Sequence, residues 1–155
     1  MPAFDEANAL NKIAAQEASI LGIKNSFGFA ANPDNLTSAM APAVAHYYPR
    51  FDAEPWAYHN VWKTNLVLRS ILFVAPRESS GGKLKFLENA AMPFGYLWRQ
   101  KFQTETVISG LLTDIQATKV WLSSGEYTVG GIELTYGATE WIGWVFEFTV
   151  QNAGQ

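Results

Sequence analysis

The two histidines are the side chains best suited to hold a metal ion. His46 and His59 flank Asp52, and imidazole nitrogens together with a carboxylate oxygen form a common zinc ligand set. No two of these residues have the four-residue spacing that places two ligands on one helix face. We therefore interpret both histidines as ordinary surface or interface residues, and we expect neither a metal nor a cofactor.

The polar loop at 77–82 is a second candidate, because serines and glycines precede Lys83. Phosphate-binding loops use such glycines to bring backbone N–H groups and a lysine onto the phosphates. The pattern requires a glycine where Arg77 stands and a serine or threonine where Leu84 stands. The motif fails, and we interpret this segment as a mobile loop before a helix.

Three carboxylates recur in the last third of the chain, at Glu133, Glu140 and Glu147. Paired carboxylates can hydrolyse glycosidic bonds when a cleft holds them on either side of the bond. Nothing in the spacing predicts such a cleft, and the Gly-x-Ser-x-Gly pattern of serine hydrolases is absent. A solvated sheet face is the simpler interpretation, so we expect a protein that is not an enzyme.

The composition is poor in charge and rich in aromatic rings. Of 155 residues, 16% are charged and 14% are aromatic, whereas about 25% of a typical soluble domain is charged. This length predicts one domain, spanning 1–155. The rings can fill a ring-rich core, or they can be buried against partner subunits, because interface cores are enriched in Tyr, Trp and Phe.

Several classes of protein are excluded by simple absences in the sequence. There is no cysteine, hence no disulfide framework and no cysteine-based metal site. The first ten residues lack the features of a secretory signal, and no apolar run approaches the length of a membrane helix. The net charge of −3 and the pI near 5.3 do not favour specific binding of nucleic acid.

Hydrophobic periodicity predicts an α+β fold. A helix is expected over 5–21, followed by a mostly irregular segment over 24–55 with one short helix inside 36–48. Strands are expected over 56–62 and 65–75, and the latter is apolar on both faces, as in a central strand. These elements place helices and strands in separate runs along the chain.

Pro93 interrupts the next helical pattern, so we expect a break there and a helix over 93–103. Residues near 107–112 either extend that helix or form its exit loop. Strands are expected over 117–122, 132–136 and 142–150, with a turn at 123–126. The predicted architecture is an antiparallel-rich mixed β-sheet with an N-terminal helix and a second helical segment packed on it.

The charges are sorted along the chain. Residues 60–101 carry seven basic and two acidic residues, whereas residues 102–155 carry six acidic residues and one basic residue. Such sorting suits head-to-tail contacts between copies, and it equally suits pairing between neighbouring segments of one sheet. Both interpretations remain open at this point.

The layout resembles the tail terminator proteins of long-tailed bacteriophages. The resemblance rests on the N-terminal helix, the aromatic connection 42–49, the strand ending at Val74-Ala75-Pro76, and the polar loop with its following helix. The most telling part is the closing hairpin over 132–150, with Tyr136-Gly137 at its turn and Gly143 within the last alternating strand. It covers nearly the whole chain as a pattern.

This resemblance implies a structural virion protein, assembled in the host cytoplasm, that forms a hexameric ring at the head-proximal end of the tail. The ring would stop growth of the tail tube and would contact the tube protein and the head–tail connector. DNA would pass through its lumen without specific binding, and no membrane would be involved. The candidate interface residues are Arg77, Lys83, Lys85, Glu133, Glu140, Glu147, Trp56 and Trp62.

Two other functions stay open from the sequence. The chain can be another neck or head-completion subunit of a phage, because such proteins share this architecture. It can also be a small-molecule binding domain whose aromatic pocket is lined by Trp56, Tyr58, Trp62 and Trp98. A hydrolase of unrecognised type is a third, weaker alternative.

Overall fold

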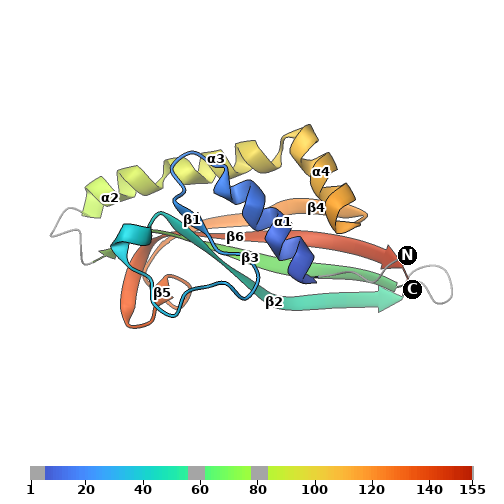
Figure 1. Cartoon of the computed structure of the whole chain (residues 1–155), viewed down its shortest axis with the longest axis horizontal. Coiled ribbons are helices and arrows are strands. Elements are labelled where there is room, and N and C mark those ends of the chain that lie inside the picture. The colour runs from blue at the N-terminus through green and yellow to red at the C-terminus, as the bar shows by residue number, and fades with distance from the viewer. Residues whose placement is uncertain (1–5, 56–61, 78–83, 155) are drawn as a thin grey trace.

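The structure is a computed structural model, and it describes residues 6–55, 62–77 and 84–154. In these residues four α-helices lie against one side of a β-sheet, so the predicted α+β class is confirmed (Figure 1). The helices are α1 (Glu6–Ala18), α2 (Leu84–Ala91), α3 (Pro93–Phe102) and α4 (Glu105–Ile115). The strands are β1 (Asn25–Ser26), β2 (Ala43–Pro55), β3 (Trp62–Pro76), β4 (Lys119–Val129), β5 (Thr135–Tyr136) and β6 (Thr139–Gly154).

The sheet is mixed but mostly antiparallel, as predicted. Its strand order is β1-β2-β3-β6-β4, and the short β5 pairs with β6 off this path. Only the β1–β2 pair is parallel among the described pairs. Because β1 pairs only with the first residues of β2, the outer edge of β2 lacks a partner strand over most of its described length, and β4 forms the opposite edge.

The main core lies between the sheet and the helices. Alternate residues of β3, including Leu66, Leu68 and Leu72, point toward the helices and are buried. They pack against α1, α3 and α4, which contribute the buried side chains Leu10, Ile13, Phe94, Trp98, Phe102, Leu111 and Ile115. This core holds the helices on one face of the sheet.

The other face of the sheet is covered only at one end. There Ile71 and Phe73 of β3 pack with Leu36, Leu134 and Trp141 in a second buried cluster. Two connections supply the cover, the one between β1 and β2 and the one between β4 and β6 (Figure 1). We call the remaining, uncovered part the open face, which carries the side chains of Arg69, Ser124, Glu126, Thr128, Val145 and Glu147.

The prediction of a mostly irregular segment over 24–55 was wrong in its second half, where residues 43–55 form the long strand β2. The short helix expected inside 36–48 is present as the 3-10 helix Ser38–Met40. Pro49 lies where the β2–β3 register shifts, between Tyr47 and Arg50, on an edge strand. A bulge on an edge strand tolerates proline, because no ladder hydrogen bond is lost there.

Three further predictions near the C-terminus need correction. Residues 105–115 form the separate helix α4, which is neither an extension of the helix over 93–103 nor its exit loop. Residues 123–126 do not turn: β4 continues through them, with a register shift between Leu122 and Ser124. Residues 132–134 are turns, and only Thr135–Tyr136 of the strand expected over 132–136 is a strand.

Several predictions are confirmed by the structure. The helical zone breaks at Met92 and Pro93, and proline occupies the first turn of α3. The strand expected over 65–75 is the core of β3, and the strand expected over 142–150 is the core of β6. The strand expected over 56–62 lies outside the described residues, except for Trp62, which begins β3.

Candidate functional site: the open face and the two sheet edges

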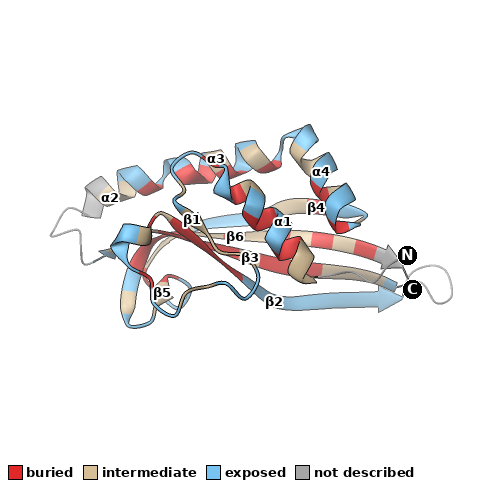
Figure 2. Ribbon diagram, in the orientation of Figure 1, coloured by how far each residue is buried: buried red, intermediate tan, exposed pale blue. Residues whose placement is uncertain are grey.

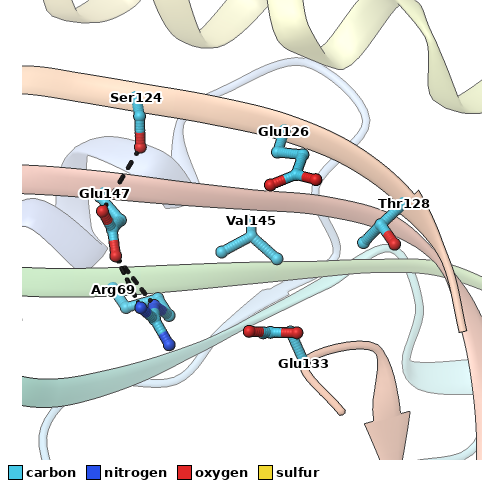
Figure 3. Close-up of a pocket in the computed structure, with 7 residues that line it drawn as sticks. All are labelled: Arg69, Ser124, Glu126, Thr128, Glu133, Val145 and Glu147. Atoms are coloured by element: carbon cyan, nitrogen blue, oxygen red, sulfur yellow. Dashed lines mark hydrogen bonds and ion pairs between the residues drawn. The ribbon is translucent and has the colours of Figure 1, made fainter. Parts of the chain in front are cut away.

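A shallow, charged pocket of about 160 Å³ lies on the open face. Figure 3 shows that β3, β6 and β4 supply most of its lining, and that Glu133 reaches in from the connection between β4 and β6. Alternation of side chains brings Arg69, Val145 and Glu147 to this face, since their strand neighbours on either side point into the core.

Arg69 and Glu147 form the central contact of the pocket. The Arg69 Nη2 and Nε atoms donate to Glu147 Oε2 at 2.6 and 3.2 Å. The two residues face each other in the β3–β6 register, so the pair is positioned by two adjacent central strands. Ser124 Oγ, from β4, donates to the other carboxylate oxygen at 3.5 Å.

The pocket carries more negative than positive charge. Glu126 and Glu133 line it together with Glu147, and Arg69 is the single cation among the lining residues. Neither Glu126 nor Glu133 forms an ion pair with any described residue. Two carboxylates are therefore available to attract a cationic group from outside the chain.

A larger groove of about 530 Å³ lies on the opposite side of β4, against α3. Its floor is aromatic: Trp144 and Phe146 line it, and their rings stack at 5.5 Å. Gly95 lets α3 approach closely, because a Cβ there would lie 2.5 Å from the Trp144 ring. The exposed side chains of Met92 and Tyr96 stand beside this floor.

The outer half of β2 is the most exposed part of the sheet. Residues from Tyr47 to Pro55 are all exposed, and Figure 2 shows this half of the strand extending past the helices. Large rings are exposed here: Tyr47, Phe51 and Trp62 are 41%, 60% and 50% accessible. Phe51 pairs with Leu66 and Trp62 pairs with Pro55, so both rings belong to the β2–β3 hairpin.

A buried polar cluster, which the sequence analysis did not predict, joins α1 to the sheet and to α3. Glu17 is fully buried, and its Oε1 lies 2.5 Å from His46 Nε2 and accepts from Ser70 Oγ at 3.1 Å. Its Oε2 accepts from Trp98 Nε1 at 2.7 Å. The signal available was Glu17 on the apolar stripe of the first helix, where an acid is rare unless it is paired.

The hydrogen bonds define how the proton is shared in this cluster. His46 Nδ1 contacts the Phe27 carbonyl, which only accepts, so Nδ1 carries a proton. The bond between Nε2 and Glu17 then has one proton between them, whichever atom holds it. In both arrangements every polar atom of the cluster has a hydrogen-bond partner, so the cluster holds α1 rigidly against the sheet and α3.

His46 is therefore not a surface residue, and it does not converge with Asp52, the carboxylate considered with it as a metal ligand. His46 points into the core, whereas Asp52 is exposed and belongs to the open side of β2. His59 lies outside the described residues. Among the residues that the structure describes, no group of three His, Asp or Glu side chains is arranged to hold a metal ion.

The predicted interface residues are distributed over three places. Glu133 and Glu147 meet in the open-face pocket. Arg77 lies at the far end of the sheet, where its Nη1 is 3.3 Å from Glu140 Oε2 in an exposed ion pair. Trp62 is exposed on the β2–β3 hairpin. The Arg77–Glu140 pair shows that some of the sorted charge is matched within one chain.

The remaining predicted residues are less informative. Lys83 and Trp56 lie outside the described residues, and Lys85 belongs to the first turn of α2. Trp98, proposed to line an aromatic pocket with Trp62, is instead buried and bonded to Glu17. Trp98 stacks on Phe146, which pairs with Ser70, eight residues from Trp62 along β3 and hence roughly 26 Å away.

No protein-family model matches the chain, and no curated protein sequence matches it either. None of the described helices is long and apolar enough to cross a membrane.

Proposed function

We propose that this chain is a structural subunit that assembles into a ring, with the role of a phage tail terminator as its specific form. The observation that supports assembly is the exposed outer edge of β2, together with the rings of Tyr47, Phe51 and Trp62 beside it. A long edge strand bearing exposed aromatic side chains favours pairing with another chain.

The electrostatics of the open face also suit this role. Glu126 and Glu133 give the face a negative excess, and DNA is repelled by carboxylates near its phosphates. If this face lines the lumen, duplex DNA passes without being held. The tail-specific part of the proposal, a ring that stops tube growth and joins the tail to the head connector, rests on the resemblance in sequence pattern.

Two measurements test the proposal in order of specificity. Native mass spectrometry of the purified chain, alone and mixed with the tube protein, should show a sixfold species; a strict monomer in both samples would contradict ring assembly. Deleting the gene from its phage should then give abnormally long or unjoined tails, restored by the intact gene. Normal particles after deletion would contradict the terminator role and leave ring assembly standing.

A ligand-binding role is supported by a different site from the one predicted. The groove between α3 and β4 has an aromatic floor and a volume within the range of small-molecule sites. If it binds a small apolar ligand, that ligand should raise the melting temperature of the intact chain. Trp144→Ala should remove this shift, because Trp144 forms part of the floor.

A further inference from the structure

We infer that the outer edge of β2 in one copy pairs with the free edge of β4 in the next copy, which makes the sheet continuous around the ring. The inference rests on the proposed self-assembly and names the surfaces that would carry it. Both edges lack a strand partner along residues 50–54 of β2 and along β4, within the part of the chain that is described. They lie on opposite sides of one sheet, so the contact is head-to-tail, the kind that can close a ring.

The strand directions are compatible with this pairing. β2, β3, β6 and β4 are successively antiparallel, so β2 and β4 run in opposite directions within one copy. A neighbouring copy moved sideways, without being turned over, therefore presents β2 antiparallel to β4. The same movement keeps the open faces of the two copies on one side and their helices on the other.

The side chains of β2 then meet matching surfaces on either side of β4. Arg50 pairs with Val67, so it belongs to the open side of the sheet, whereas Phe51 pairs with Leu66 and belongs to the helix side. Ser124 of β4 lines both the acidic pocket and the aromatic groove, which places this edge between the two. Arg50 can thus enter the pocket of its neighbour while Phe51 enters the groove.

Charge supports the same match. Glu126, which β4 holds at the edge of the pocket, forms no ion pair with a described residue, whereas Glu133 enters the pocket on the side of β3 (Figure 3). The ion pair that Arg50 forms within its own chain is weak, because its Nε lies 3.6 Å from Asp52 Oδ2 and both side chains are well exposed. Arg50 is therefore available to a stronger acidic site on a second copy.

The register of the contact follows from placing Arg50 beside Glu126. Within one copy, cross-strand pairing connects Arg50 of β2 to Val67, Val67 to Thr149, and Thr149 to Trp121 of β4. Trp121 and Glu126 are five residues apart, but the bulge between Leu122 and Ser124 reduces the stagger to four positions of the β4–β6 register. Over the four strands of one copy this is about one residue per strand. That ratio is the one found in closed barrels whose strands tilt by about 36°.

Disulfide trapping tests the contact directly, because the chain has no cysteine of its own. In the inferred register Asp52 of one copy faces Ser124 of the next. We would mix one population carrying Asp52→Cys with a second carrying Ser124→Cys and oxidise the mixture. A bond between β2 and β4 of one copy is excluded, since three strand spacings separate them by roughly 14 Å and a disulfide spans at most about 7 Å between Cα atoms.

The expected product is a disulfide-linked pair containing one copy of each population, and the doubly substituted chain should give a ladder up to the ring. The control replaces Asp52→Cys with Lys12→Cys, on the exposed side of α1, and should give no such link. Links between two Asp52→Cys copies would overturn the inference in favour of a symmetric β2–β2 contact. An oligomer without links would overturn it and leave the proposed function intact, whereas a chain that stays monomeric both alone and with the tube protein would overturn both.

A charge exchange tests the role of the pocket independently of the cysteines. Arg50→Glu should raise the concentration for half-assembly by about tenfold or more, because it replaces a cation beside Glu126 with a carboxylate. Adding Glu126→Arg to the same chain should restore assembly to within about threefold of the wild type. Unchanged assembly in Arg50→Glu, or the absence of any restoration in the double variant, would contradict the placement of Arg50.

Discussion

Replacing Glu17 tests the strongest energetic claim about the fold. Glu17→Ala removes the hydrogen-bond partner of three buried groups, namely His46 Nε2, Ser70 Oγ and Trp98 Nε1. Each buried polar group left without a partner costs about 1–3 kcal/mol, so three of them cost roughly 3–9 kcal/mol. A domain of this size is stable by only about 5–15 kcal/mol, so the variant should be close to unfolding at 25 °C.

Glu17→Gln is the matched control, because glutamine can serve the same three partners without a charge. Its carbonyl oxygen can accept from Trp98 Nε1, while its amide group donates to His46 Nε2 and to Ser70 Oγ. Removing a buried charge and keeping the hydrogen bonds should change the free energy of unfolding by less than about 1.5 kcal/mol.

The assay is urea denaturation of both variants, followed by far-ultraviolet circular dichroism and by tryptophan fluorescence. We expect Glu17→Ala to lose at least about 3 kcal/mol and Glu17→Gln to stay near the wild type. A loss below about 1 kcal/mol in Glu17→Ala would refute the reasoning, since water would then be satisfying groups that the structure shows as buried. Equal, large losses in both variants would indicate that the ionic form of Glu17 carries the stability.

Two further predictions concern other parts of the sheet and the helices. Gly143→Ala should destabilise the protein by at least about 3 kcal/mol, because its Cβ would lie 1.7 Å from the backbone oxygen of Leu72. Gly110→Ala should instead raise the free energy of unfolding by about 0.5–1 kcal/mol, because a Cβ at this position of α4 meets nothing within 4 Å beyond the helix's own backbone. Burial, followed by the charges of Tyr47 and Asp34, raises the pKa of Tyr136 above its usual value of 10.0. The folded state therefore holds this proton more tightly, so stability present below pH 10 is lost as the pH rises through the raised pKa. Melting temperatures measured from pH 8 to pH 12 should fall less steeply in Tyr136→Phe than in the wild type, and parallel curves would contradict this assignment.

Hydrophobic periodicity predicted those elements whose burial follows one regular pattern along the whole element. β3 was predicted from apolar residues on both of its faces and β6 from clean alternation, and both are central strands. α3 begins at Pro93 because proline suits a first helical turn. β2 was not predicted, since its outer half is exposed on both sides and carries Pro49 and Pro55, which are typical of loops. What makes these residues a strand is pairing with β3, which is a tertiary contact and leaves no local pattern.

The site was predicted in part for a similar reason. The acidity of Glu133 and Glu147 is visible in the sequence, and strand alternation brings Glu147 to the open face. Their neighbour Arg69 could not be predicted, because the pairing of β3 with β6 is needed to place it opposite Glu147. The prediction that His46 is a surface or interface residue was wrong, because its partner, Glu17, lies 29 residues away on α1 and only the fold brings the two together.

The sorted charges can now be divided between contacts within a chain and contacts between chains. Because β3 comes from the basic segment and β6 from the acidic one, their antiparallel pairing matches Arg69 with Glu147 inside one copy. The same geometry matches Arg77 with Glu140 at the end of the sheet. Lys63, the other cation of β3, pairs with Glu54 of β2. Glu126, which forms no ion pair with a described residue, lies on the β4 edge, whereas Glu133 enters the pocket on the side of β3 (Figure 3). Unpaired negative charge at a free sheet edge destabilises an isolated subunit little, because water solvates it. The same charge favours binding of a neighbour that brings positive charge to that edge. The outer strand of the same sheet carries Arg50 on the matching side, which is why one chain can supply both halves of the contact.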